Sequence, residues 1–149
     1  MEQLISFFDR SKGKWISQRT TYKLSNKQMN SLQSSIIIKP DQSSSNSQLI
    51  ASLRWGEISR QIIKNLNNQD FVNGNFKFHL RFTNQFNTKQ VVTLCSITDK
   101  SLITFKTRYG STTVDETYWF ATDNLRLSTS IIKQCNFCVA VSFCSEIKI

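Results

Sequence analysis

Apolar and polar residues alternate along most of this chain, a pattern typical of strands that bury one face. In the segment FKFHLRF at 76–82, every even position is large and apolar, and every odd position is polar or charged. Strands are predicted at 15–23, 34–39, 49–55, 75–82, 90–97, 102–108, 112–121, 124–133 and 136–147. Turn-forming residues separate them, as expected for a series of short antiparallel strands.

Two segments have helical spacing instead. Residues 2–10 place their apolar side chains on one stripe, and Gly13 is positioned to end a short amphipathic helix there. Isoleucines and a leucine recur at helical spacing between residues 57 and 67, which predicts a second, inserted helix.

Many short strands with few helices predict an all-β fold, either a closed barrel or a sandwich. The two differ in function, since a small up-and-down barrel can enclose one ligand whereas a sandwich fills its centre with side chains. With 149 residues, the chain is long enough to bury a core, and residues 1–149 are expected to form a single domain.

The strands at 112–121 and 124–133 predict the register of a hairpin. If its turn is centred near Asp123, paired residue numbers sum to about 246, so that Glu116 lies opposite Ser130. The even positions, which then share a mixed polar face, are Glu116, Tyr118, Phe120, Arg126, Ser128 and Ser130. The odd face is apolar, with Trp119, Leu125, Leu127 and Ile131.

The last strand repeats this division, with large residues at odd positions from Phe137 to Phe143 and small ones at even positions from Cys138 to Cys144. A barrel that turns the small and polar face inward has room for a ligand. A sandwich with the polar face in water fits the same pattern, and Arg126 and Glu116 would then form an exposed cross-strand ion pair of little energetic value.

The charge of the chain is strongly positive, since 19 Lys and Arg face 10 Asp and Glu and give a net charge of +9. These cations are scattered, without a basic helix face or a run of three, which disfavours a nucleic-acid partner. No apolar run is long enough to cross a bilayer, and the first ten residues lack the features of a signal peptide.

Four cysteines in a chain without a secretory signal indicate free thiols. Cys135 and Cys138 have the spacing of a redox or zinc motif, but on a strand this spacing sends them to opposite faces unless the segment turns at Asn136. His79 lies on the polar face of its strand, so no metal site is predicted. Trp15 is expected to be core at a closed end of the barrel.

Several segments resemble a known family. They are GKW at 13–15, SQRT at 17–20, ETYWFATDNLRLSTS at 116–130 and SFCSEI at 142–147, with LRW at 53–55 between them. The first of these looks like the Gly-x-Trp signature of lipocalin-type barrels. Together they resemble the S/U-type phycobiliprotein lyases, the CpcS/CpeS group.

The resemblance implies a lipocalin-like up-and-down antiparallel β-barrel with a short N-terminal helix. It also implies a lyase that binds an open-chain tetrapyrrole, phycoerythrobilin or phycocyanobilin, without covalent attachment. The enzyme would then catalyse thioether formation with a Cys of an apo-phycobiliprotein subunit of phycoerythrin or phycocyanin. The alternative is a bilin carrier or chaperone without transferase activity.

The family's pigment-binding positions carry over onto Arg19, Trp55, Tyr118, Arg126, Ser128 and Ser130, with Glu116 as the catalytic carboxylate. Many members have Arg where this chain has Ser128, which leaves one arginine on that strand. Arg126 suits a propionate because its guanidinium offers paired donors, and Arg19 is expected to hold the second propionate. Glu116 would accept hydrogen bonds from pyrrole N–H groups and favour the cationic, more electrophilic pigment.

The resemblance implies no permanently bound cofactor, with phycobilin as substrate, and it allows a homodimer. Phycobiliproteins are typically acidic, so the +9 charge is expected to steer the client subunit toward the lyase. The richness in Asn, Lys, Ile and Ser resembles proteins of AT-rich organelle genomes. We therefore expect a plastid of a red-algal lineage, with its stroma as the location, or else a cyanobacterial cytoplasm.

Overall fold

The computed structural model describes residues 2–38, 50–55, 58–63, 71–72, 75–83, 88–99 and 101–149. Within these ranges it contains the helix α1 (Glu2–Ser11) and the strands β1 (Gly13–Lys23), β2 (Gln28–Ile38), β3 (Ile50–Trp55), β4 (Ile58–Ile63), β5 (Phe71–Val72), β6 (Asn75–Thr83), β7 (Thr88–Asp99), β8 (Leu102–Tyr109), β9 (Thr112–Thr122), β10 (Leu125–Gln134) and β11 (Phe137–Lys148).

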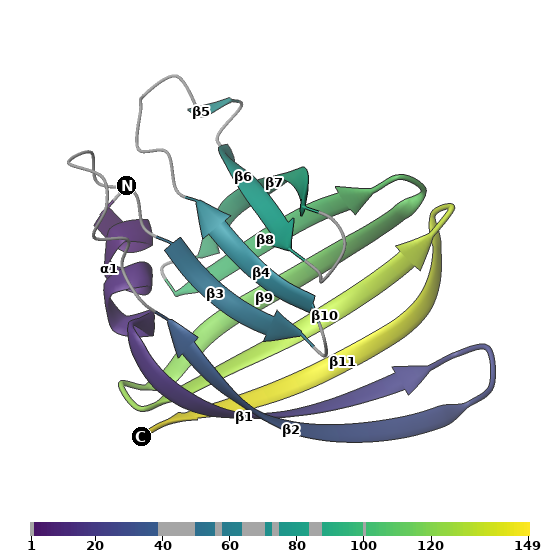
Figure 1. Cartoon of the computed structure of the whole chain (residues 1–149), viewed down its shortest axis with the longest axis horizontal. Helices are drawn as coiled ribbons and strands as arrows, with labels where there is room; N and C mark the ends of the chain where they lie inside the picture. The colour runs from purple at the N-terminus through teal and green to yellow at the C-terminus, as the bar shows by residue number, and fades with distance from the viewer. Residues whose placement is uncertain are drawn as a thin grey trace.

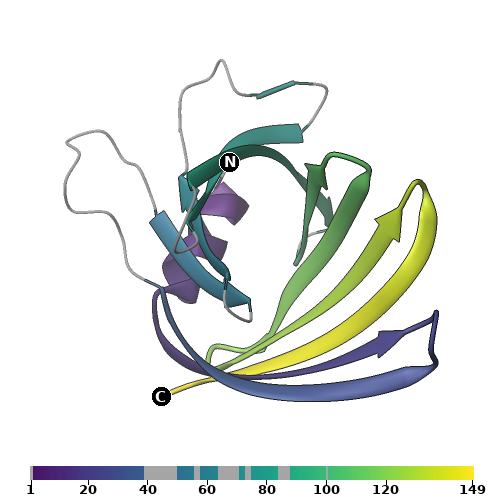
Figure 2. The same cartoon turned by 45° about the vertical axis from the view of Figure 1, so that its right-hand side comes forward.

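All paired strands run antiparallel in one sheet, in the order β2-β1-β11-β10-β9-β8-β7-β6-β4-β3, with β5 added beside β6. The chain meanders from each strand to its neighbour, and β1 pairs with β11. The sheet curls round until its two end strands, β2 and β3, contact each other (Figures 1 and 2). The prediction of an all-β, up-and-down barrel with a short N-terminal helix is confirmed.

The predicted second helix is wrong for residues 58–63, which form β4 between β3 and β6. The segment ISRQII is half isoleucine, and β-branched side chains fit a pleated sheet better than a helix. β4 forms hydrogen bonds with β3 along one edge and with β6 along the other. A helix at this position would leave the facing edges of β3 and β6 without these partners. The remaining residues of the predicted helix lie outside the described ranges.

Helix α1 covers one end of the barrel (Figure 1). Its buried Phe7 packs against the rings of Phe105, Tyr118 and Phe120, with centroids 5.6 to 6.2 Å away. Trp15, at the start of β1, is fully buried, and its indole N–H donates to the carbonyl of Ser11 at 2.9 Å. Trp15 is therefore core, as predicted.

Gly13 makes the sharp connection from α1 to β1. Its φ of +125° is a conformation that L-residues with a Cβ rarely adopt. A Cβ there would also lie 2.9 Å from Cε of Lys148 on β11. The glycine thus ends the helix, as the sequence predicted, and lets β1 begin directly beside β11.

Candidate functional site

The register of the β9–β10 hairpin agrees with the prediction. Ser130 pairs with Glu116 and Ser128 with Tyr118, so their numbers sum to 246. A register shift between Leu125 and Arg126 follows the turn without changing which residues share a face. The even positions of both strands therefore lie on one side of the sheet.

This shared face points into the barrel and is polar. On β1, β9, β10 and β11 the buried polar residues are Ser17, Glu116, Arg126, Ser128, Ser130, Ser142 and Glu146. The opposite face carries exposed apolar side chains, including Phe143 and Ile147, which are 48% and 55% exposed. The sandwich alternative, with the polar face in water, is wrong.

Nearest α1, Arg126 and Glu146 form a buried ion pair, with Nε donating to Oε2 at 2.6 Å. Nη1 of the same guanidinium donates to Oγ of Ser11 at 2.9 Å, which ties α1 to the sheet. The guanidinium also lies 5.1 Å from the Trp15 ring and 5.4 Å from the Tyr118 ring. The proposed exposed pair of Arg126 with Glu116 is wrong, because both residues are buried and the partner comes from β11.

Two buried polar atoms at this pair have no hydrogen-bond partner within the part of the chain that the structure describes: Nη2 of Arg126 itself and Oγ of the neighbouring Ser128. Leaving such a group unsatisfied costs roughly 1–3 kcal/mol, and more when it is charged. Native proteins usually avoid that cost unless a ligand or an ordered water completes the group. Both atoms lie on the inward face, so they mark a polar binding position there.

Ser130 is the next inward position of β10 after Ser128, farther from α1, and it lies between Ser142 on β11 and Glu116 on β9. Arg19 of β1 reaches this row, and its Nη1 donates to Oγ of Ser130 and of Ser142, each at 3.2 Å. Three of the predicted site residues, Arg19, Glu116 and Ser130, are therefore brought together.

The electrostatics of the row keep Arg19 charged. Burial of the guanidinium alone would lower the pKa of Arg19, but the net shift is upward because Tyr118, Cys144, Glu116 and Glu146 surround it. The pKa of Tyr118 is raised, first by burial and then by Glu116, so the phenol stays protonated and can donate a hydrogen bond.

Two thiols also point inward. Sγ of Cys144 lies 3.0 Å from Oγ of Ser17, and burial is the main cause that raises the pKa of this thiol. Burial raises the pKa of Cys95, on β7, to about 12. Both cysteines are therefore thiols near neutral pH, and their nucleophilicity is low.

Cys135 and Cys138 are exposed and free. Cys135 and Asn136 form the β10–β11 turn with φ values of 48° and 68°, so the chain does turn at Asn136 as the sequence allowed. No group of three or more His, Cys, Asp or Glu that could hold a metal occurs among the described residues. The side chains of Trp55 on β3 and His79 on β6 lie outside the part that the structure describes, so the role of Trp55 stays a prediction.

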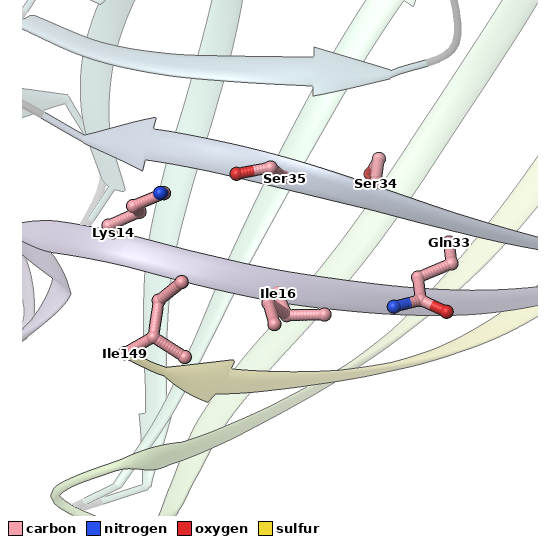
Figure 3. A pocket seen from close by; sticks show the side chains of 6 residues that line it. All are labelled: Lys14, Ile16, Gln33, Ser34, Ser35 and Ile149. Atoms are coloured by element: carbon pink, nitrogen blue, oxygen red, sulfur yellow. The ribbon is translucent and has the colours of Figure 1, made fainter.

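A shallow hollow occurs on the outer surface, lined by Lys14, Ile16, Gln33, Ser34, Ser35 and Ile149 (Figure 3). It lies over β1 and β2 on the outward side of the sheet, and none of the predicted site residues lines it. The candidate site is therefore the inward polar face.

The sequence placed Ser142 on the small, inward side of the last strand, as the structure does, but Ser11 and Glu146 were not predicted as members of this face. The signal for Glu146 was present, because the even positions of β11 point inward from Ala140 onward and the pattern continues past Cys144. Ser11 gave no signal, since its position depends on how α1 docks.

Comparison with known proteins adds to this geometry. The model of the family described as "CpeS-like protein" matches residues 3–66 and 62–149. A chromophore lyase CpcS/CpeS homolog of Pyropia yezoensis is 63% identical over 149 residues, which is all of both chains. Within the described residues, no helix is long and apolar enough to span a membrane.

Two solved structures are similar at 15% identity. An S-type phycobiliprotein lyase CPES from Guillardia theta matches with a TM-score of 0.48, covering 98% of this chain and 92% of that one. A protein of unknown function from the DUF3598 family of Nostoc punctiforme matches with a TM-score of 0.65, covering 95% of this chain and 49% of that one. At this identity the second match supports the fold alone.

Proposed function

Because the chain belongs to the CpeS-like family, we propose that it is a phycobiliprotein chromophore lyase that binds a phycobilin on the inward polar face and transfers it to a client protein. The observation that carries the proposal is a pair of buried polar groups, Nη2 of Arg126 and Oγ of Ser128, which find no hydrogen-bond partner among the described residues. An open-chain tetrapyrrole offers two propionates and a row of ring nitrogens and lactam oxygens, which are suitable partners for such donors.

The arrangement of the donors changes how the propionates are held. Nε and Nη1 of Arg126 already donate to Glu146 and Ser11, so Nη2, which has no partner among the described residues, is the nitrogen offered to a pigment carboxylate or lactam oxygen. The hydroxyl of Ser128 is adjacent on the same strand and supplies a second contact. Arg19, which stays charged, serves the second propionate from the next row.

Glu116 is the residue placed to activate the pigment. Its buried carboxylate accepts hydrogen bonds from pyrrole N–H groups and favours the protonated, cationic pigment. The client thiol then adds across an exocyclic carbon–carbon double bond of the pigment. A C–S bond forms, the π bond breaks, and the thiol proton is transferred to the pigment, so no oxidant or reductant is needed.

The two buried thiols, Cys95 and Cys144, are compatible with transfer of the pigment to a cysteine of the client. Cys144 lies on the same face as Arg19 and Ser128, and Cys95 lies on β7 in the aromatic core. Because the raised pKa values keep both as thiols, they compete poorly with the client cysteine for the electrophilic pigment. The composition further supports a plastid of a red-algal lineage as the location.

The test uses the full chain with phycoerythrobilin or phycocyanobilin and purified apo-α and apo-β subunits. Binding is expected to shift and sharpen the pigment absorption, and incubation with a subunit is expected to give an acid-stable coloured adduct. Glu116→Gln is expected to retain the absorption shift and to lose roughly 100-fold in transfer rate. A shift without any adduct would assign the chain as a bilin carrier, and the absence of both would refute the proposal.

A further inference from the structure

Three hairpin turns meet at the end of the barrel away from α1 (Figure 1). They are the β1–β2, β8–β9 and β10–β11 turns, and we refer to residues 23–29, 108–111 and 133–139 together as the hairpin rim. The backbone N–H of Leu24 donates to the carbonyl of Val139 at 3.0 Å, and that of Cys135 to the carbonyl of Ser111 at 2.9 Å. These bonds join the turns into one surface.

The hairpin rim exposes large apolar side chains. Phe137 is 76% exposed, Met29 67% and Leu24 42%. A register shift after Ile132 pairs Phe137 with Gln134, so that Phe137 shares the even face of β10 at its far end. Aromatic and methionine side chains are enriched at protein interfaces, and their exposure costs free energy when no partner covers them.

All charged side chains of the hairpin rim are positive. It carries Lys23, Lys27, Arg108 and Lys133, and its three ranges contain no Asp or Glu. None of these four cations forms an ion pair within the part of the chain that the structure describes.

The α1 end differs in this respect. There Arg10 pairs with Asp123 at 2.9 Å and Lys12 with Asp9 at 2.6 Å. The rim therefore carries four cations around an apolar centre, with no acidic residue in its own three ranges. Such a surface is complementary to an acidic protein surface with an apolar patch of its own.

We propose that the hairpin rim is the docking surface for the acidic apo-subunit that receives the pigment. This inference rests on the proposed function. The position of the rim fits that role, because α1 covers the opposite end. Along β10, Ser130 of the Arg19–Glu116 row lies closer to the rim than Arg126 does. A subunit docked on the rim presents its acceptor thiol at the end of the barrel that α1 does not cover.

The experiment measures binding of a purified, negatively charged apo-subunit to the full chain without pigment, at low and high salt. Charge reversal of Lys23, Lys27 and Lys133 to Glu is expected to slow association about tenfold or more at low salt, and the difference is expected to shrink at high salt. Phe137→Ser is expected to raise Kd roughly tenfold at either salt concentration.

Matched controls separate the rim from general surface effects. Lys14→Glu reverses an exposed lysine on the α1 side of β1 and is compared with Lys27→Glu alone. Phe143→Ser removes an exposed phenylalanine from the outer wall and is compared with Phe137→Ser. Both controls are expected to bind the subunit within about twofold of wild type, and all variants are expected to bind pigment normally, as measured by absorption.

The inference is wrong if the wild-type chain does not bind the apo-subunit, or if the rim variants bind it as well as their controls do. Failure of the wild type to bind or transfer pigment is a different result, because it refutes the proposed function and leaves the subunit-binding measurement to be judged separately.

Discussion

The buried pair of Arg126 and Glu146 makes a quantitative prediction about stability. Both side chains are 2% exposed, and Nε and Oε2 are 2.6 Å apart. Glu146→Gln keeps the shape of the side chain but removes the charge that compensates the guanidinium. Breaking a buried ion pair from one side typically costs about 3–5 kcal/mol, so we expect a loss of that size in the free energy of unfolding. For a domain of this length, this corresponds to a fall in Tm of roughly 6–20 °C.

The assay is equilibrium unfolding in urea at neutral pH, followed by tryptophan fluorescence. Asp123→Asn is the control, since its ion pair with Arg10 is exposed and is expected to contribute less than about 1 kcal/mol. The double variant Arg126→Met with Glu146→Leu replaces the pair by apolar groups. It is expected to be more stable than either Glu146→Gln or Arg126→Met alone.

The result that would refute this reasoning is a loss below about 1 kcal/mol for Glu146→Gln, comparable to that of Asp123→Asn. Simple additivity of Arg126→Met and Glu146→Leu in the double variant would refute it as well, because it would mean that the two groups do not interact.

Three further predictions concern the thiols and one turn. Folding raises the pKa of Cys95 from its ordinary 9.0 to about 12, so above pH 9 the folded chain keeps a thiol proton that the unfolded chain loses. The free energy of unfolding is therefore expected to fall between pH 9 and 11, and to fall less steeply in Cys95→Ala. Urea unfolding across that pH range measures both. Alkylation at pH 8 followed by mass spectrometry is expected to modify Cys135 and Cys138 in the native chain, and Cys95 and Cys144 only in urea; rapid native labelling of the latter two would contradict their burial. Gly13→Ala is expected to cost about 1–3 kcal/mol in the free energy of unfolding because φ is +125°, and an unchanged urea midpoint would show that the connection relaxes.

The alternation of polar and apolar residues predicted the inward face correctly where a short turn fixed the register of two strands. With Asp123 and Asn124 as the turn, the face that holds Glu116, Arg126 and Ser130 followed directly from parity. The same reasoning could not identify the partner of Arg126. That partner lies on β11, the next strand of the hairpin, and the register shift after Ile132, which parity does not reveal, sets Arg126 opposite Glu146 instead of Ser145.

Local patterns failed where two periods compete or where a bulge intervenes. The isoleucines of β4 fit a helix as well as a strand, and the ladders with β3 and β6 decided the outcome. The register shift after Ile132 places Phe137 and Cys138 on the faces opposite to those that simple alternation gives. No sequence pattern showed that Ser11 would reach Arg126, since that contact depends on the docking of α1.

The pairing of β1 with β11 affects how the chain folds during synthesis. Trp15 of β1 lies opposite Lys148 of β11, so β1 finds this neighbour only after β11, which is synthesised more than a hundred residues later, has emerged from the ribosome. Until then β1 has β2 alone for hydrogen bonding, and the Ser11–Arg126–Glu146 tie cannot form. Contacts of such long sequence separation slow folding to the millisecond-to-second range. Closure of this part of the sheet therefore waits for β11, and loss of β11 is expected to leave the sheet open to chaperones and proteases.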